Sequence, residues 1–130
     1  MTGDPFEKAD VYQGFANLDA CGAWVPGPPW ILGHRGTPRE APENTLSGLR
    51  RALSLGLDGI EYDVRAAGGG EPVLLHDATL DRTTDASGPL AGRELSELFG
   101  VDAGSWFGRG FRGEPVPTLA EALDELGDGD

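Results

Sequence analysis

From residue 30 onward, apolar and polar positions follow patterns that predict short strands separated by turns and loops. The apolar run at 30–32 predicts a buried strand. Residues 59–65 alternate between apolar and polar at period two, which predicts a second strand. Residues 73–76 predict a third strand that follows too closely for a helix to intervene, so we expect an antiparallel hairpin. A turn near the glycines at 68 and 69 would set Glu61 opposite His76.

Two longer helices are predicted on either side of a loop-rich stretch. The first is capped by Asn44 or Thr45 and stops at Gly56, and its apolar face carries Leu46, Leu49, Ala52 and Leu53. The second opens with the T-x-x-E spacing of a capping box at Thr118 and ends at Gly127, with apolar residues at Leu119, Leu123 and Leu126. Residues 77–116 are rich in Gly, Pro, Asp and Ser and predict a loop-rich insertion with one short helix around 93–99.

Residues 1–29 carry no clear periodicity and end in a Pro/Gly-rich stretch, which indicates an N-terminal arm or linker ahead of a domain at 30–130. No stretch approaches the roughly 18 consecutive apolar residues that a membrane helix needs, and the N-terminus has neither the basic start nor the apolar run of a signal peptide. A single cysteine, Cys21, excludes an intrachain disulfide. These features predict a cytoplasmic protein without a membrane span.

The chain is strongly acidic, with 22 Asp and Glu against 10 Lys and Arg and a formal net charge of −12. Such a charge repels nucleic acid and anionic lipid surfaces, so we expect no nucleic-acid partner. It repels phosphate esters as well. Phosphate chemistry would therefore need local cations, supplied by arginine or by a bound metal.

Glu61 and Asp63 stand two apart on the strand predicted at 59–65, so their side chains point the same way with Cα atoms about 6.5 Å apart. Both carboxylates can reach one hard cation, and oxygen ligands of this kind suit Mg²⁺ or Ca²⁺. An isolated E-x-D pair is more often just an exposed strand face. The only two histidines, His34 and His76, change this interpretation because each ends an apolar run and imidazole suits proton transfer near neutrality.

Arg35 follows His34 directly and lies between two glycines, Gly33 and Gly36. Its guanidinium can fork onto a phosphate while the glycines let the backbone approach a ligand. Two other interpretations stay open at this stage. The arginine can simply pair with Glu40 or Glu43, and the glycines can serve only the turn.

Five motifs in order, H-R-G, P-E-N-T, E-Y-D, H-D-x-x-L-D-R-T-T and P-T-L-x-E, resemble the signature of the glycerophosphodiester phosphodiesterase family. The resemblance covers residues 31 to about 126, which is less than half of that family's catalytic domain. It implies an α/β fold, the N-terminal part of a TIM-like (β/α)8 barrel that stays incomplete in this chain, since roughly three strands cannot close a barrel.

The resemblance also implies a reaction and a set of roles. The family hydrolyses glycerophosphodiesters to glycerol 3-phosphate and an alcohol, and the neighbouring glycerol hydroxyl is thought to attack phosphorus and give a cyclic phosphate that water opens. Residues matching Glu61 and Asp63 bind Mg²⁺ or Ca²⁺ with a third carboxylate from a later strand, which has no counterpart before Asp130. Those matching His34 and His76 act as acid and base, and the one matching Arg35 contacts phosphate. If His76 lies beside Glu61, we expect its pKa to be raised.

Two alternatives remain from the sequence. The chain is either an incomplete part of a longer phosphodiesterase or a short product. Such a product would act as a non-catalytic module of the same fold or assemble with a partner that supplies the rest. An open or closed reading frame after Asp130 would distinguish the two. A phospholipase D-like lipid phosphodiesterase is the other alternative. Its hydrophobic lip would be formed by Phe99, Trp106, Phe107 and Phe111, whereas the favoured interpretation of these residues is packing in the core of the insertion.

Overall fold

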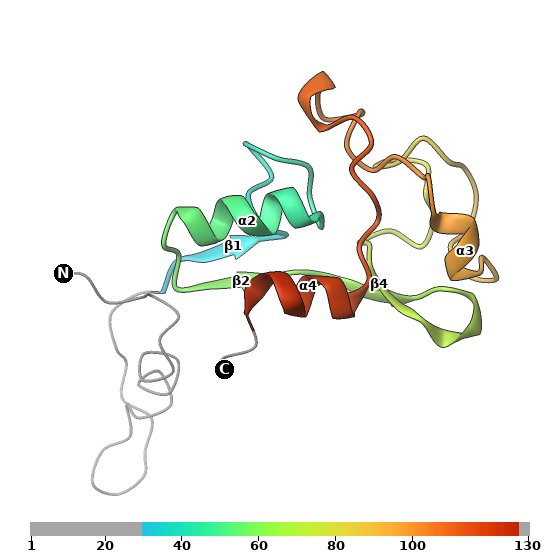
Figure 1. The fold of residues 1–130 in the computed structure, drawn as a ribbon, viewed down its shortest axis with the longest axis horizontal. Helices are drawn as coiled ribbons and strands as arrows, with labels where there is room; N and C mark the ends of the chain where they lie inside the picture. Colours follow the sequence, from blue (N-terminus) through green and yellow to red (C-terminus); the bar gives the residue numbers. More distant parts are fainter. Residues whose placement is uncertain (1–29, 128–130) are drawn as a thin grey trace, which may run out of the picture.

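The computed structural model describes residues 30–127, so the predicted arm at 1–29 lies outside the described residues. The elements, in order, are β1 (Leu32–His34), α2 (Leu46–Ser54), β2 (Gly59–Glu61), β3 (Val64–Ala66), β4 (Pro72–Leu74), α3 (Leu95–Leu98) and α4 (Leu119–Leu126), with 3₁₀ turns at Gly68–Gly70 and Arg109–Phe111. β1 pairs with β2 in parallel, whereas β3 and β4 form a separate antiparallel pair. Figure 1 shows the insertion lying beyond β4, at the far end of the molecule from β1.

The parallel pair β1–β2 is linked by α2, which makes it a strand–helix–strand unit. Its register sets Leu32 opposite Gly59 and His34 opposite Glu61. The strand predicted at 30–32 is therefore displaced by two residues, and His34 is its last member. The single strand predicted at 59–65 is also wrong. It divides after Glu61 because the backbone N–H of Asp63 donates to the Asn44 side chain (3.1 Å) rather than to a neighbouring strand.

The hairpin predicted at 59–76 exists, but its register differs from the prediction. Val64 lies opposite Leu74, and the ladder continues with the Leu75 N–H donating to the Asp63 carbonyl at 3.1 Å. The turn centres on Gly69, whose φ of 76° favours glycine. Glu61 consequently does not face His76, because it belongs to the other sheet.

Both long helices begin at the predicted caps. Thr45, not Asn44, caps α2, since its hydroxyl oxygen accepts the Gly48 N–H at 3.2 Å. Thr118 and Glu121 form the capping box of α4. Helix α4 turns Ala122 inward, whereas Leu123 is 44% exposed, so the expectation that Leu123 shares the apolar face is wrong. The contacts to the core come from Leu119, Ala122 and Leu126.

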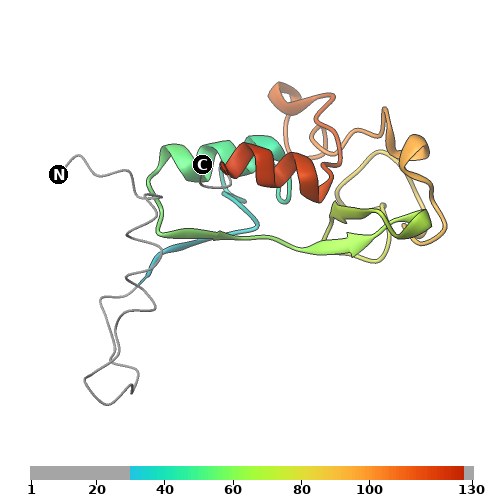
Figure 2. The same ribbon diagram turned by 60° about the horizontal axis from the view of Figure 1, so that its bottom comes forward.

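Strand β4 is shared by two hydrophobic clusters. Leu74 is buried with Leu49 of α2 and Ala122 of α4, and Figure 2 shows both helices on one side of the strands. Val73 and the following Leu75 point into a second cluster inside the insertion, whose other buried members are Ala67, Leu80, Leu90, Leu98, Ala103 and Val116. The period of two along β4 thus joins the strand–helix–strand unit to the insertion.

The insertion is mostly loop, as predicted, and its one α-helix is α3. The Asp102 carboxylate fixes one of its loops, accepting from the Ser105 hydroxyl and from the backbone N–H groups of Ser105, Gly104 and Gly113. These donors hold the pKa of Asp102 well below its ordinary value, the Ser105 hydroxyl contributing most.

Three of the four aromatic residues of the insertion pack against one another. Trp106, Phe107 and Phe111 pack edge to face, with centroid distances of 5.8 and 5.4 Å, while Phe99 is exposed. Within 30–127, no helix has the length and apolar character needed to cross a bilayer.

We expect Thr45→Ala to lower the free energy of unfolding by about 1 kcal/mol or more, because the buried hydroxyl both caps α2 and donates to the Pro42 carbonyl at 2.6 Å. Urea denaturation followed by circular dichroism measures the loss. Thr45→Ser is the control, since it keeps the hydroxyl. Equal losses in both variants would show that the methyl group, not the cap, stabilises the helix.

We expect Asp102→Ala to loosen the loop at 102–113 and leave the rest of the fold intact. Hydrogen exchange should then accelerate at the backbone amides of Gly104, Ser105 and Gly113, which lose their acceptor. Asp124→Ala, an exposed change on α4, is the matched control. Unchanged exchange at the three amides would contradict the role of Asp102.

Candidate active site

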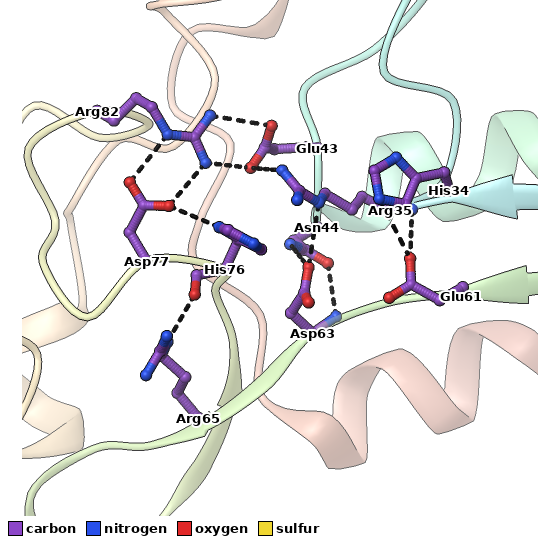
Figure 3. A network of polar contacts seen from close by, with 10 residues as sticks. All are labelled: His34, Arg35, Glu43, Asn44, Glu61, Asp63, Arg65, His76, Asp77 and Arg82. Carbon is purple, nitrogen blue, oxygen red and sulfur yellow. Dashed lines mark hydrogen bonds and ion pairs between the residues drawn. The ribbon is translucent and has the colours of Figure 1, made fainter.

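His34 and Glu61 meet where β1 and β2 end. The His34 Nε2 atom lies 3.8 Å from Glu61 Oε2, and both side chains are exposed at 66% and 47%. The backbone N–H of Arg35 donates to the same carboxylate oxygen at 3.2 Å. Parallel pairing therefore brings the first predicted histidine and the first predicted metal ligand together, as Figure 3 shows.

Arg35 lies between two of the carboxylates of the site, those of Glu43 and Asp63. Its Nη1 donates to Glu43 Oε1 at 3.3 Å, and its Nε lies 3.3 Å from Asp63 Oδ2. The second contact is an ion pair without hydrogen-bond geometry, so the buried Nε has no hydrogen-bond partner among residues 30–127. The expected pairing with Glu43 is present, whereas Glu40 pairs with Arg51.

Asn44 holds Asp63 by two reciprocal hydrogen bonds. Its Nδ2 donates to Asp63 Oδ2 at 3.0 Å, and its Oδ1 accepts the Asp63 backbone N–H at 3.1 Å. Arg35 and Asn44 are the only non-glycine residues in the described part of the chain with positive φ, at 53° and 55°, and the Asn44 N–H donates to the Arg35 carbonyl. Strained backbone of this kind collects at functional sites.

The glycines beside Arg35 are required by the turn itself. A Cβ at Gly33 would lie 2.5 Å from the Gly36 carbonyl oxygen. Gly36 has a φ of 93°, and a Cβ there would lie 2.8 Å from the backbone of Gly48 in α2. Close packing of the turn against α2 therefore explains both positions.

His76 lies beside Asp77 rather than Glu61, which corrects the predicted partner. Its Nδ1 is 2.7 Å from Asp77 Oδ1. Hydrogen bonds from Arg82, the larger contribution, and from His76 hold the pKa of Asp77 well below its ordinary value. This carboxylate is therefore ionised and can only accept hydrogen bonds. Nδ1 must then be the protonated nitrogen, and Nε2 is left to exchange a proton. Arg65 Nε donates to the His76 carbonyl at 2.7 Å.

Arg82 completes the network from the insertion side. It donates to both oxygens of Asp77 and to both oxygens of Glu43. A continuous chain of polar contacts consequently runs from His34 through Arg35 and Arg82 to His76 (Figure 3). The carboxylates raise the pKa of Arg82 further above its ordinary value, Asp77 contributing most.

The charges of the site suit a divalent cation. Four carboxylates, Glu43, Glu61, Asp63 and Asp77, lie in one network with three arginines, Arg35, Arg65 and Arg82, which leaves a surplus of one negative charge. In Glu61 and Asp63 the contacts to other described residues use only Oε2 and Oδ2, so one oxygen of each carboxylate has no protein partner within 30–127. Carboxylate oxygens are the ligands that hard divalent cations prefer. No cluster of three or more potential ligands occurs in that part of the chain.

Four site residues had no assigned catalytic or metal-binding role in the sequence prediction: Glu43, Asn44, Asp77 and Arg82. The sequence contained a signal that could have identified them, because all four lie inside the motifs P-E-N-T and H-D-x-x-L-D-R-T-T. Sequence spacing could not indicate that the side chains of these two motifs meet.

Comparison with known proteins identifies the fold to which this site belongs. Residues 34–130 match the glycerophosphoryl diester phosphodiesterase family. The chain is 44% identical over 100 residues to a glycerophosphodiester phosphodiesterase of Caldanaerobacter subterraneus, covering 77% of this chain and 41% of the relative. It is 40% identical to human glycerophosphodiester phosphodiesterase 1, covering 72% and 29%. The chain thus spans less than half the length of these relatives.

Two solved structures are similar as well. The glycerophosphodiester phosphodiesterase of Agrobacterium tumefaciens superposes with a TM-score of 0.72 at 45% identity, covering 75% of this chain and 42% of that one. An Oleispira antarctica phosphodiesterase in complex with the product sn-glycerol-3-phosphate superposes with a TM-score of 0.73 at 44% identity, covering 75% and 40%. The predicted partial TIM-like barrel is confirmed, and the sheet is not closed within the described residues. On sequence and structure together, the chain belongs to the glycerophosphoryl diester phosphodiesterase family.

Proposed function

We propose that this chain supplies the N-terminal half of the active site of a metal-dependent phosphodiesterase that converts glycerophosphodiesters to glycerol 3-phosphate and an alcohol. The observation that carries the proposal is the continuous polar network joining His34 to His76 through Arg35 and Arg82. Two imidazoles, a guanidinium and the carboxylates of Glu61 and Asp63 all belong to this network, which supports the proposal. The Oleispira relative in complex with sn-glycerol-3-phosphate supports the substrate class.

Glu61 and Asp63 are the residues that would hold the cation, through the carboxylate oxygens that Arg35 and Asn44 do not contact. A bound divalent cation would offset negative charge on the phosphoryl oxygens. Two carboxylates fill only part of a six-coordinate shell, so the remaining ligands are water, substrate and a carboxylate from a later segment of the longer protein. Asn44 keeps Asp63 oriented for this role.

Arg35 is the proposed phosphate contact. Its guanidinium already lies between Glu43 and Asp63, and its buried Nε lacks a hydrogen-bond acceptor in the described part of the chain. The side chain is 19% exposed, so a phosphoryl oxygen would approach the accessible part of the guanidinium.

The two histidines divide the proton transfers. One histidine removes the proton from the glycerol hydroxyl next to the phosphodiester. The oxygen of this hydroxyl attacks phosphorus as the bond to the leaving alcohol breaks, and the other histidine protonates that alcohol. Water then opens the cyclic phosphate with the roles reversed. His76 offers Nε2 for its step because Asp77 holds Nδ1–H, whereas His34 is adjacent to Glu61.

We expect His34→Ala in the longer protein that carries this chain to lower kcat by about 10²- to 10⁴-fold while the fold is retained, because one proton transfer loses its donor or acceptor. Release of glycerol 3-phosphate from glycerophosphocholine measures turnover, and circular dichroism checks the fold. Near-normal turnover would reject the acid–base role of His34.

We expect Glu61→Gln to raise the concentration of Mg²⁺ or Ca²⁺ needed for half-maximal activity, since the neutral amide is a weaker ligand than a carboxylate. The measurement is a metal titration of the chelator-treated longer protein. Glu71→Gln, an exposed change in the β3–β4 hairpin, is the matched control. An unchanged titration for Glu61→Gln would place the cation elsewhere.

A further inference from the structure

Arg82 binds two carboxylates from distant parts of the chain. Its Nε and Nη2 donate to Asp77 Oδ2 and Oδ1, both at 2.9 Å. Its Nη1 and Nη2 donate to Glu43 Oε2 and Oε1 at 3.1 and 2.7 Å. Both edges of the planar guanidinium are therefore used, an arrangement that a lysine cannot reproduce.

Each carboxylate leads on to a different group of the proposed site. Asp77 Oδ1 also accepts from His76 Nδ1 at 2.7 Å. Glu43 Oε1 also accepts from Arg35 Nη1 at 3.3 Å. Arg82 is thus separated by a single carboxylate from the imidazole on one side and from the phosphate-binding arginine on the other, as Figure 3 shows.

The contact with Glu43 affects how available Arg35 is. Glu43 is a nearly buried side chain, 10% exposed, and it is shared between two guanidinium groups. If Arg82 is removed, this carboxylate keeps only Arg35 as an ionic partner and must pair with it more closely to compensate for its desolvation. The positive charge that Arg35 can offer to a phosphate then falls.

The contact with Asp77 affects the orientation of His76. Asp77 accepts three hydrogen bonds from side chains, two of them from Arg82. Without Arg82 the carboxylate is free to rotate about its side-chain bonds and to bind water, so Nδ1–H of His76 loses a fixed acceptor. The imidazole can then flip or exchange its tautomer.

We infer that Arg82 is a positioning residue that fixes the His76 imidazole and the Arg35 guanidinium together, through Asp77 and Glu43, so that neither half of the site is set independently of the other. Its consequences for turnover rest on the proposed function. The geometry itself can be tested without turnover.

The test uses nuclear magnetic resonance on the 130-residue chain labelled with ¹⁵N at histidine and arginine. His34→Gln assigns the imidazole signals, because the chain has only two histidines, and Arg35→Lys assigns the Arg35 Nε–H signal. In the unsubstituted chain we expect the signals of a His76 imidazole that is protonated at Nδ1. Arg82→Gln should abolish that single-tautomer pattern and shift the Arg35 Nε–H signal.

Three further variants separate coupling from general disruption. Asp77→Asn should change the His76 signals more than the Arg35 signal, and Glu43→Gln the Arg35 signal more than the His76 signals. Arg39→Gln, which removes an exposed arginine outside the network of Figure 3, should change neither. The inference is overturned if either signal, that of the His76 imidazole or that of Arg35 Nε–H, is the same in Arg82→Gln as in Arg39→Gln.

Two outcomes are kept distinct by this design. Should Arg82→Gln fail to fold by circular dichroism, the Asp77→Asn and Glu43→Gln variants decide, and a His76 tautomer unchanged in Asp77→Asn rejects the inference. If the signals follow the expected pattern but the longer protein does not hydrolyse glycerophosphodiesters, the proposed function fails and the positioning role of Arg82 stands.

Discussion

The parallel pairing of β1 with β2 is the constraint on which the rest of the site depends. Both strands end at the same level, with His34 opposite Glu61, so the residues that follow them emerge side by side. Arg35 leaves β1 and Asp63 follows β2, and their side chains meet at 3.3 Å. Helix α2 makes this pairing possible because it supplies the connection that two parallel strands require. A change of register by one residue would turn Glu61 away from His34.

Local sequence signals predicted the elements well where a side chain satisfies the backbone nearby. Thr45 and Thr118 cap helices within their own turns, and Gly56 and Gly127 follow the helix ends, so the information lies within a few residues. The strand at 59–65 was harder to predict. Its division after Glu61 results from Asn44, which is 19 residues away and takes the Asp63 N–H, and alternation of apolar and polar residues carries no trace of that contact.

The candidate site shows the same difference between local signals and contacts made by distant residues. His34, Arg35, Glu61, Asp63 and His76 could be named from the sequence because each stands at a strand end within a recognisable motif. Glu43 was expected as a possible partner of Arg35, but the partner of His76 and the contact of Glu43 with Arg82 were not, because they depend on the strand pairing and on where the insertion folds back. His76 pairs with its neighbour Asp77, and Glu43 receives Arg82 across 39 residues. The prediction placed Glu61 beside His76 in one hairpin, whereas the division of the strand after Glu61 leaves Glu61 in the β1–β2 sheet and starts the hairpin at Val64.

Strand β4 has one further consequence. Its residues alternate between the two clusters, so Leu74 reports on the packing of α2 and α4 while Val73 and Leu75 report on the insertion. A substitution at Leu74 changes the packing of one cluster, whereas a substitution at Val73 or Leu75 changes the packing of the other. The insertion can therefore be repacked around Val73 and Leu75 without disturbing the contacts of Leu74 with α2 and α4.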